Sequence, residues 1–142
     1  MALDKNCMYC MNDERVSNIM VKIADLSVST LYLFKDQSYT GRCVLACNKG
    51  HFNEIFELPV EMRNQMIDDV ARVAKALKTT VNADKINYGI FGDNMPHLHF
   101  HIVPKIKGGK DWGGTFEMSP ADKVFLSEEA QEALIAQIKS NL

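Results

Sequence analysis

The sequence between residues 97 and 103 reads His-Leu-His-Phe-His-Ile-Val, an alternation of histidine with apolar side chains. Side chains on a β-strand point to opposite faces in turn. The stretch therefore predicts a strand that turns His97, His99 and His101 to one face and an apolar row to the core. Histidines gathered in register are typical of chemistry, because imidazole binds metals and moves protons near neutral pH. We expect the chain to fold around a sheet with one reactive face.

The other predicted elements are strands at 30–34, 42–47 and 85–91, a polar turn at 35–41, a helix from 59 to about 83 and a helix at 127–142. The long helix carries apolar residues at spacings of three and four: Met62, Met66, Val70, Val73, Leu77 and Val81. The order strand, strand, helix, strand, strand, helix does not repeat a β-α-β unit. It favours an α+β fold, with an antiparallel sheet of about five strands, the long helix and the C-terminal helix packed to one side.

The length of 142 residues fits a single domain, 1–142, with an N-terminal segment at 1–20 and a C-terminal loop and helix at 105–142. Hydrophobic residues make up 46% and charged residues 24%, which excludes a disordered or collagen-like chain. A formal net charge of -2 argues against a surface that coats nucleic acid. We find neither a secretory signal nor an apolar run near the ~20 residues of a membrane helix. We therefore expect a cytoplasmic protein that binds neither nucleic acid nor membrane.

The sequence has four cysteines, and two of them form the motif Cys7-Met8-Tyr9-Cys10. Structural disulfides are rare in the reducing cytosol, so this motif indicates a metal site or a redox pair. A thioredoxin-like interpretation is disfavoured because no β-α-β pattern surrounds the motif. Cys43 and Cys47 fall in a predicted strand, where we expect small buried side chains.

The histidine strand allows two kinds of chemistry. Alternate residues on a strand lie ~6.6 Å apart, so the backbones of His97 and His101 would be ~13 Å apart. A zinc–nitrogen bond is only ~2.0–2.1 Å, so one ion can take two neighbouring histidines but not all three without strain. The other arrangement divides the labour: one imidazole attacks an electrophile, a second handles protons, and the third holds structure or a metal.

The stretch 97–103 resembles the His-φ-His-φ-His-φ-φ signature of the histidine triad (HIT) superfamily, in which φ is apolar. The flanking runs Gly-Asp-Asn-Met-Pro at 92–96 and Pro-Lys at 104–105 are similar to the pattern of bacterial HIT proteins. Asn87 before the strand and Lys-Gly-His at 49–51 fit as well, and the order of elements agrees over most of the chain.

The resemblance implies a nucleotide hydrolase or nucleotidyl transferase that cleaves at the α-phosphate of a nucleoside phosphoramidate or a dinucleoside polyphosphate. His99 would be the nucleophile and form a nucleotidyl-histidine intermediate, with its other ring nitrogen fixed by a backbone carbonyl. His101 would contact the phosphate or the bridging atom and help the leaving group depart. Backbone N–H groups at Asp93, Asn94 and Met95 would cradle phosphate oxygens, and Asn87 would contact the phosphate or the leaving group.

Four positions depart from the family pattern, and one of them is Asn94, where many HIT proteins carry Ser or Thr. Many HIT proteins carry Gln or Asn at the position of Asp93, and a carboxylate there repels phosphate unless it points away. Many also carry Gly-His where this chain has Gly41 followed by Arg42. Asp36 comes later than the usual ribose-binding acid. The nucleobase and ribose contacts therefore stay open.

The resemblance also implies a zinc site. Several bacterial HIT proteins hold zinc with an N-terminal Cys-x-x-Cys, a histidine after the second strand and the first histidine of the triad. In this chain the set is Cys7, Cys10, His51 and His97. Four protein ligands leave no open position, so the metal would be structural. The other interpretations of Cys7 and Cys10 are an idle thiol pair and a redox pair.

Other functions compete with this assignment. A zinc hydrolase with His-x-His ligands would activate a metal-bound water and would need an open metal position. A non-catalytic nucleotide-binding or partner-binding dimer is a further alternative. HIT proteins commonly pair through a helix and a sheet edge, so we expect a homodimer.

Trp112 lies in a glycine-rich loop at 108–114. Its side chain either covers a nucleobase, crosses to a dimer partner or anchors the C-terminal segment.

Overall fold

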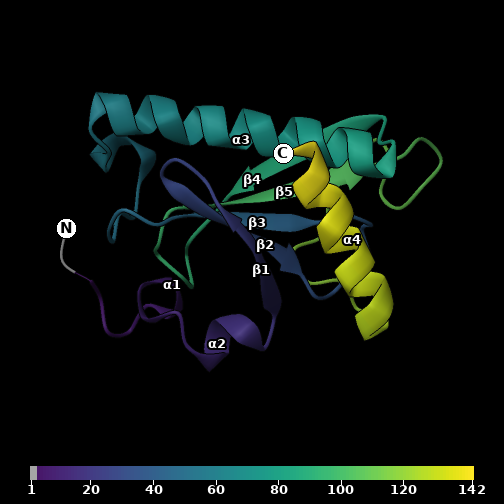
Figure 1. Ribbon diagram of the computed structural model, residues 1–142, viewed down its shortest axis with the longest axis horizontal. Coiled ribbons are helices and arrows are strands. Elements are labelled where there is room, and N and C mark those ends of the chain that lie inside the picture. The colour runs from purple at the N-terminus through teal and green to yellow at the C-terminus, as the bar shows by residue number, and fades with distance from the viewer. Residues whose placement is uncertain (1–2) are drawn as a thin grey trace.

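Five strands form one antiparallel sheet in the order β1-β2-β3-β5-β4 in the computed structural model, which describes residues 3–142 (Figure 1). The strands are β1 (Met20–Asp25), β2 (Ser29–Phe34), β3 (Cys43–Cys47), β4 (Lys85–Ile90) and β5 (His99–Lys105). The helices are α1 (Met8–Met11), α2 (Glu14–Ser17), the 3-10 turn η1 (Ile55–Glu57), α3 (Val60–Val81) and α4 (Glu128–Asn141). The predicted α+β fold with a five-stranded sheet is confirmed.

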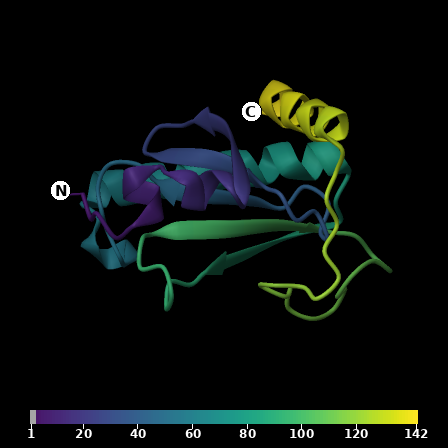
Figure 2. The ribbon, with the colours of Figure 1, turned by 90° about the horizontal axis from the view of Figure 1, so that it is seen from below.

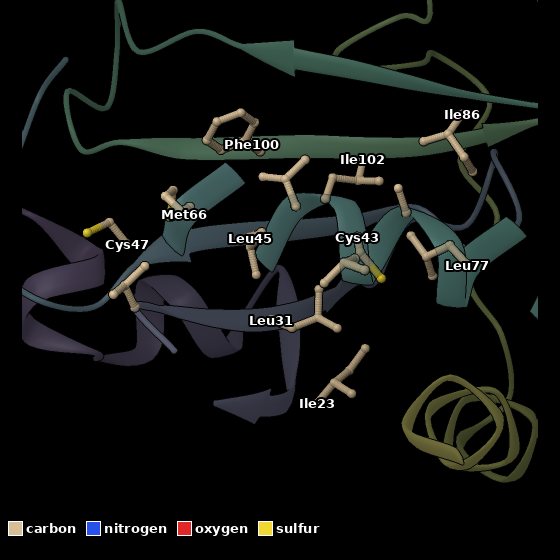
Figure 3. Close-up of a cluster of buried hydrophobic side chains, with 14 of the residues drawn as sticks. Ile23, Leu31, Cys43, Leu45, Cys47, Met66, Leu77, Ile86, Phe100 and Ile102 are labelled. Atoms are coloured by element: carbon tan, nitrogen blue, oxygen red, sulfur yellow. The ribbon is translucent and has the colours of Figure 1, made fainter. Parts of the chain in front are cut away.

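The main core lies between one face of the sheet and the helices α3 and α4. Helix α3 buries the apolar stripe that its sequence spacing predicts, with Met66, Val70, Val73 and Leu77 inside. The sheet contributes Phe100 and Ile102 of β5, together with side chains of β2 and β3 (Figure 3). Leu98, directly before β5, belongs to the same cluster. Cys43 and Cys47 belong to this cluster, as expected. This packing fixes which face of β5 the histidines occupy.

The opposite face of the sheet is covered by the N-terminal segment, for which the sequence predicted no helix. Figure 1 shows α1 and α2 on the side of the sheet away from α3. A second apolar cluster forms there from Met8, Val16, Met20, Tyr32, Val44 and Ala46. The face of the sheet that carries the histidines therefore also carries apolar side chains next to them. The N-terminal segment, with its two short helices, covers these apolar side chains and excludes water from them.

Two strands differ from the prediction by more than one residue. Strand β1 was not located from the sequence, and β5 begins at His99 and continues through Pro104 to Lys105. Proline has no N–H for a sheet ladder and normally avoids central strands. Pro104 is tolerated because β3 pairs with β5 only from His99 to Ile102, so at Pro104 only β4 lies alongside.

A long connection, residues 106–127, joins β5 to α4. Figure 2 shows it loop out past the end of β5 and turn back toward the sheet before it reaches α4. Tyr39 anchors it, because its hydroxyl accepts a 2.6 Å hydrogen bond from the Glu117 N–H and donates to Asp111. We call residues 115–118 the wall segment. Within the described residues, no helix is both long enough and apolar enough to cross a membrane.

Candidate active site and metal-binding group

His99 stands at the start of β5 with one ring nitrogen engaged. Its Nδ1 lies 2.6 Å from the backbone oxygen of His97. A carbonyl only accepts, so Nδ1 carries the proton and Nε2 keeps its lone pair. Burial lowers the pKa of His99, which keeps the ring neutral. The side chain therefore presents an unprotonated nitrogen, as a nucleophile requires.

His101 has the opposite arrangement. Its Nδ1 lies 3.2 Å from the Nη2 atom of Arg42. A guanidinium only donates, so Nδ1 accepts the hydrogen bond and the proton is on Nε2. Burial, followed by the charge of Arg42, lowers the pKa of His101 to about 3. His101 is thus a neutral ring with an N–H donor at its far edge.

His99 and His101 lie side by side on the floor of one open pocket. Their ring centroids are 5.3 Å apart. The pocket has a volume of about 790 Å³, within the usual range for small-molecule sites. It is lined by Phe91, Gly92, Asp93, Asn94, Met95, His99, His101, Thr115, Phe116 and Met118. The structure thus brings together five predicted site residues: His99, His101, Asp93, Asn94 and Met95.

The loop between β4 and β5 forms one side of this pocket. Asp93 and Asn94 are exposed, and Gly92 has a φ of 150°, a conformation that favours glycine. The wall segment forms the facing side, where Phe116 and Met118 take part. The pocket therefore combines two imidazoles, a polar loop and an apolar wall.

His97 precedes β5 and points to a different set of partners. Its Nε2 lies 2.7 Å from the backbone oxygen of Cys47, so Nε2–H donates and Nδ1 keeps its lone pair. This Nδ1 lies 3.3 Å from Cys7 Sγ, 3.6 Å from Cys10 Sγ and 3.4 Å from His51 Nδ1. Cys10 Sγ is in turn 3.3 Å from His51 Nδ1.

These separations match the edges of a metal-centred tetrahedron. Zinc bond lengths imply ligand separations of about 3.3 Å between two nitrogens and about 3.6 Å between nitrogen and sulfur. The four ligand atoms of Cys7, Cys10, His51 and His97 all lie within 4.8 Å of one another. The residues present therefore fit a metal ion, and the group contains neither His99 nor His101.

Contacts around this group hold its ligands in place. The N–H of Cys10 donates to Cys7 Sγ over 3.5 Å, because Cys7 caps the first turn of α1. Asp4 lies 3.8 Å from the Nε2 atom of His51. The ring of Tyr9 packs 5.1 Å from that of His97 and 5.2 Å from that of His99. Tyr9 thus separates the metal-binding group from the pocket, a role that the sequence did not indicate.

Asn87 and Trp112 lie apart from the His99 pocket. Both border a separate hollow of about 240 Å³, with Lys85, Lys105, Gly113 and Gly114. Trp112 is 41% exposed there. The structure therefore does not bring Asn87 to the two imidazoles.

Comparison with known proteins agrees with this arrangement. The family model described as HIT domain matches residues 27–108, more than half of the chain. The chain belongs to the HIT family. The match runs from the start of β2 past the end of β5, so it includes the three triad histidines and His51. Among curated proteins, no match was found for the chain.

Solved structures of HIT proteins share this fold. A histidine triad protein from Sinorhizobium meliloti is 26% identical, with a TM-score of 0.83 over 92% of this chain and 95% of that one. One from Bradyrhizobium japonicum is 23% identical, with a TM-score of 0.82 over 91% and 95%. A Zn-bound histidine triad family protein from Mycobacterium smegmatis is 23% identical, with a TM-score of 0.65 over 94% of both chains.

Proposed function

We propose that this HIT protein is a nucleotide hydrolase or nucleotidyl transferase that works through a nucleotidyl-histidine intermediate on His99. The observation that carries the proposal is the hydrogen bond from His99 Nδ1 to the backbone oxygen of His97. It leaves Nε2 unprotonated in a pocket large enough for a nucleotide. The substrate class is a nucleoside phosphoramidate or a dinucleoside polyphosphate, as the family resemblance implies.

The reaction has two displacements at phosphorus. His99 Nε2 attacks the α-phosphate, a P–N bond forms, and the P–O or P–N bond to the leaving group breaks. His101 Nε2–H donates a hydrogen bond to a phosphate oxygen or to the bridging atom, where negative charge develops. Water, or an acceptor in a transfer reaction, then attacks phosphorus and loses a proton. The P–N bond breaks and returns the electron pair to His99.

The loop between β4 and β5 supports the phosphate contacts. In the described part of the chain, no hydrogen-bond acceptor is found for the N–H groups of Asp93, Asn94 and Met95. Free N–H groups beside two imidazoles suit the oxygens of a phosphate, which gain negative charge in the transition state. Asn87 lies outside this pocket, so we propose that it meets only a leaving group that extends along β4.

We propose that Cys7, Cys10, His51 and His97 hold a structural zinc ion. A set of two thiolates and two imidazoles is typical of zinc, and a closed set of four ligands supplies folding free energy rather than catalysis. The alternative, a zinc hydrolase with His-x-His ligands, is disfavoured because neither His99 nor His101 belongs to the group.

The chain also has a surface suited to pairing. Strand β4 is at the edge of the sheet, and Tyr88, Ile90 and Phe91 on and after it are about half exposed. An exposed edge with apolar side chains favours pairing with another strand. We propose a homodimer that forms through this edge. We also propose a cytoplasmic location, because all four cysteines are free thiols. Light scattering at micromolar concentration tests the dimer, and a mass near 16.0 kDa would refute it.

The function is tested with a panel of nucleoside phosphoramidates, dinucleoside polyphosphates, adenylyl sulfates and nucleotide sugars. Mass spectrometry follows both the released mononucleotide and the intact protein. We expect cleavage of at least one class and a transient gain in protein mass equal to one nucleotidyl group. A panel left intact, with nucleotide bound but never cleaved, would favour the non-catalytic alternative.

A further inference from the structure

Arg42 is the feature that the proposed function leaves unexplained. It stands directly before β3, next to Gly41, whose φ of 87° turns the chain into the strand. The Arg42 side chain is 0% exposed. Among residues 3–142 no carboxylate forms an ion pair with it. Burial of an unpaired guanidinium is costly, so its neighbours must repay that cost.

The guanidinium joins β5 to the wall segment. Besides His101 Nδ1, its Nη2 lies 2.9 Å from the Met118 backbone oxygen and 3.3 Å from Met118 Sδ. Its Nη1 lies 3.3 Å from the Glu117 backbone oxygen. The group is stacked near the rings of Phe34, at 4.4 Å, and Phe116, at 5.4 Å. One cation therefore contacts both a candidate catalytic ring and the segment that walls its pocket.

We infer that Arg42 is a positioning residue: it fixes His101 in the tautomer that carries its proton on Nε2, and it fastens the wall segment against the pocket. This inference rests on the proposed function. The Arg42 guanidinium can only donate hydrogen bonds, so the Nδ1 atom of His101 must accept one from it. The Nε2–H group is then left for the substrate. In the other tautomer, His101 would present a lone pair toward a phosphate oxygen.

The surroundings of His101 leave Arg42 as the partner that decides the tautomer. The rings of Phe34, Phe91 and Phe116 lie 6.2–6.5 Å from the His101 ring and offer no hydrogen-bond partner. The titratable groups that act on His101 are Arg42 and His99. Asp93 borders the same pocket, and Asp36 acts on Arg42. The burial of His101 and the charge of Arg42 both disfavour a cationic His101.

The test compares Arg42→Met with Tyr39→Phe. Arg42→Met removes the donor to His101 and the hold on the wall segment. Tyr39→Phe removes a different anchor of the same segment, the hydroxyl that accepts from the Glu117 N–H, and leaves Arg42 and His101 in place. The ring nitrogens of His101 are followed by long-range ¹H–¹⁵N NMR, which distinguishes the tautomers without any substrate. The pH profile of kcat/KM is the second readout.

We expect wild-type and Tyr39→Phe proteins to keep Nε2 protonated on His101 from pH 5 to pH 8. In Arg42→Met we expect mixed tautomers and a pKa of His101 closer to the ordinary value near 6.5. A cationic ring carries a proton on Nε2 as well, so the loss of kcat/KM relative to wild type should be smaller at pH 5 than at pH 8. We expect kcat/KM at pH 8 to fall by about 10–100-fold, as when a partner that orients a reactive histidine is removed. Arg42→Lys, which keeps a charged donor, should recover part of this loss.

Three results would overturn the inference. They are a proton on Nδ1 in the wild type, an Arg42→Met protein with the tautomer and pH profile of the wild type, or equal changes at His101 in Tyr39→Phe. If Arg42→Met does not fold, the wild-type tautomer and Arg42→Lys decide. If no substrate is cleaved, the proposed function fails while the NMR measurement still decides the role of Arg42.

Discussion

The two ends of the histidine row are built from the same residue type but have opposite surroundings. At the His97 end, two thiols and a second imidazole converge on an unprotonated Nδ1. At the His101 end, a buried guanidinium donates to Nδ1 and leaves an N–H group facing the pocket. Between them, His99 donates from Nδ1 to the backbone of His97.

The comparison shows that neighbours, rather than position on the strand, decide what each imidazole can do. A backbone oxygen on one ring nitrogen leaves a lone pair on the other, which suits a metal ligand or a nucleophile. A guanidinium on one ring nitrogen leaves a donor on the other. In the proposed mechanism, three histidines therefore supply three functions without any change of side chain, and each function can be tested separately.

The largest effect is expected at the middle of the row. His99→Asn and His99→Ala remove the attacking nitrogen, so turnover should fall by at least about 10⁴-fold, where each tenfold corresponds to ~1.4 kcal/mol. Rates are measured under single-turnover conditions, and circular dichroism confirms that the variants fold. Retention of activity within about threefold of wild type would be incompatible with a nucleophilic His99.

The second-largest effect is expected at the His97 end, where a substitution should affect the metal-binding group and stability more than the chemistry in the pocket. Cys10→Ser removes one ligand of the metal-binding group, so zinc content should fall from about one ion per chain and the melting temperature by roughly 10 °C or more. The rate at 20 °C should stay within about tenfold of wild type, because the ligands act on His99 indirectly, through the backbone of His97 and the ring of Tyr9.

Cys43→Ala is the matched control, because the Cys43 side chain packs in the main core and Cys43 is not a member of the metal-binding group. It should keep its zinc even if it is less stable. Loss of turnover before loss of stability in Cys10→Ser, or on mild chelation of the wild type, would indicate a catalytic metal instead. Zinc near zero in protein purified without chelator would leave Cys7 and Cys10 as ordinary thiols.

A smaller effect concerns charge inside the pocket. Asp93→Asn removes a carboxylate from the loop that faces the imidazoles, so KM for an anionic substrate should fall by about 2–5-fold with kcat unchanged, since unit charges in water interact by about 1 kcal/mol at 4 Å. The gain should shrink at high salt. Asp68→Asn, on the exposed side of α3, is the control and should change neither constant. A rise in KM for Asp93→Asn would instead show that the carboxylate binds substrate.

The smallest effect concerns Asn87. Asn87→Ala should change kcat/KM by less than about twofold for a substrate with a short leaving group, and by severalfold for one that extends along β4, since one hydrogen bond contributes about 1 kcal/mol. Asn94→Ala lowers kcat/KM for both substrates if the loop contacts the phosphate. Equal losses for both substrates in Asn87→Ala would place its side chain at the phosphate.

The sequence predicted the helices and strands in which apolar residues recur at regular spacing. The apolar stripe of α3 and the alternation in β5 each depend on local spacing, and both agree with the structure. Strand β1 was missed because it lies at the sheet edge, is only partly buried and shifts register between Lys22 and Ala24. Its pairing with β2 makes it a strand, and pairing is not a local property.

The sequence predicted which residues form the site, but it did not predict which ring nitrogen of each histidine carries the proton. The alternation in the sequence placed the three histidines on one face of a strand, and the family resemblance supplied their roles and the four residues that could hold a metal. The tautomers depend on the oxygens of His97 and Cys47 and on Arg42, which only the fold brings within reach. Arg42 itself gave no sign of burial, since a long charged side chain beside a turn normally reaches solvent.

The contact between Cys7, near the N-terminus, and His97, just before β5, has a consequence for how the chain folds during synthesis. Cys7 and His97 are 90 residues apart, so their contact closes most of the chain into one loop and cannot form early in folding. During synthesis the two thiols leave the ribosome long before His97 does, at roughly 5–20 residues per second. For those seconds they are exposed to any oxidant or competing metal ion, so a reducing environment protects the assembly of this corner of the molecule.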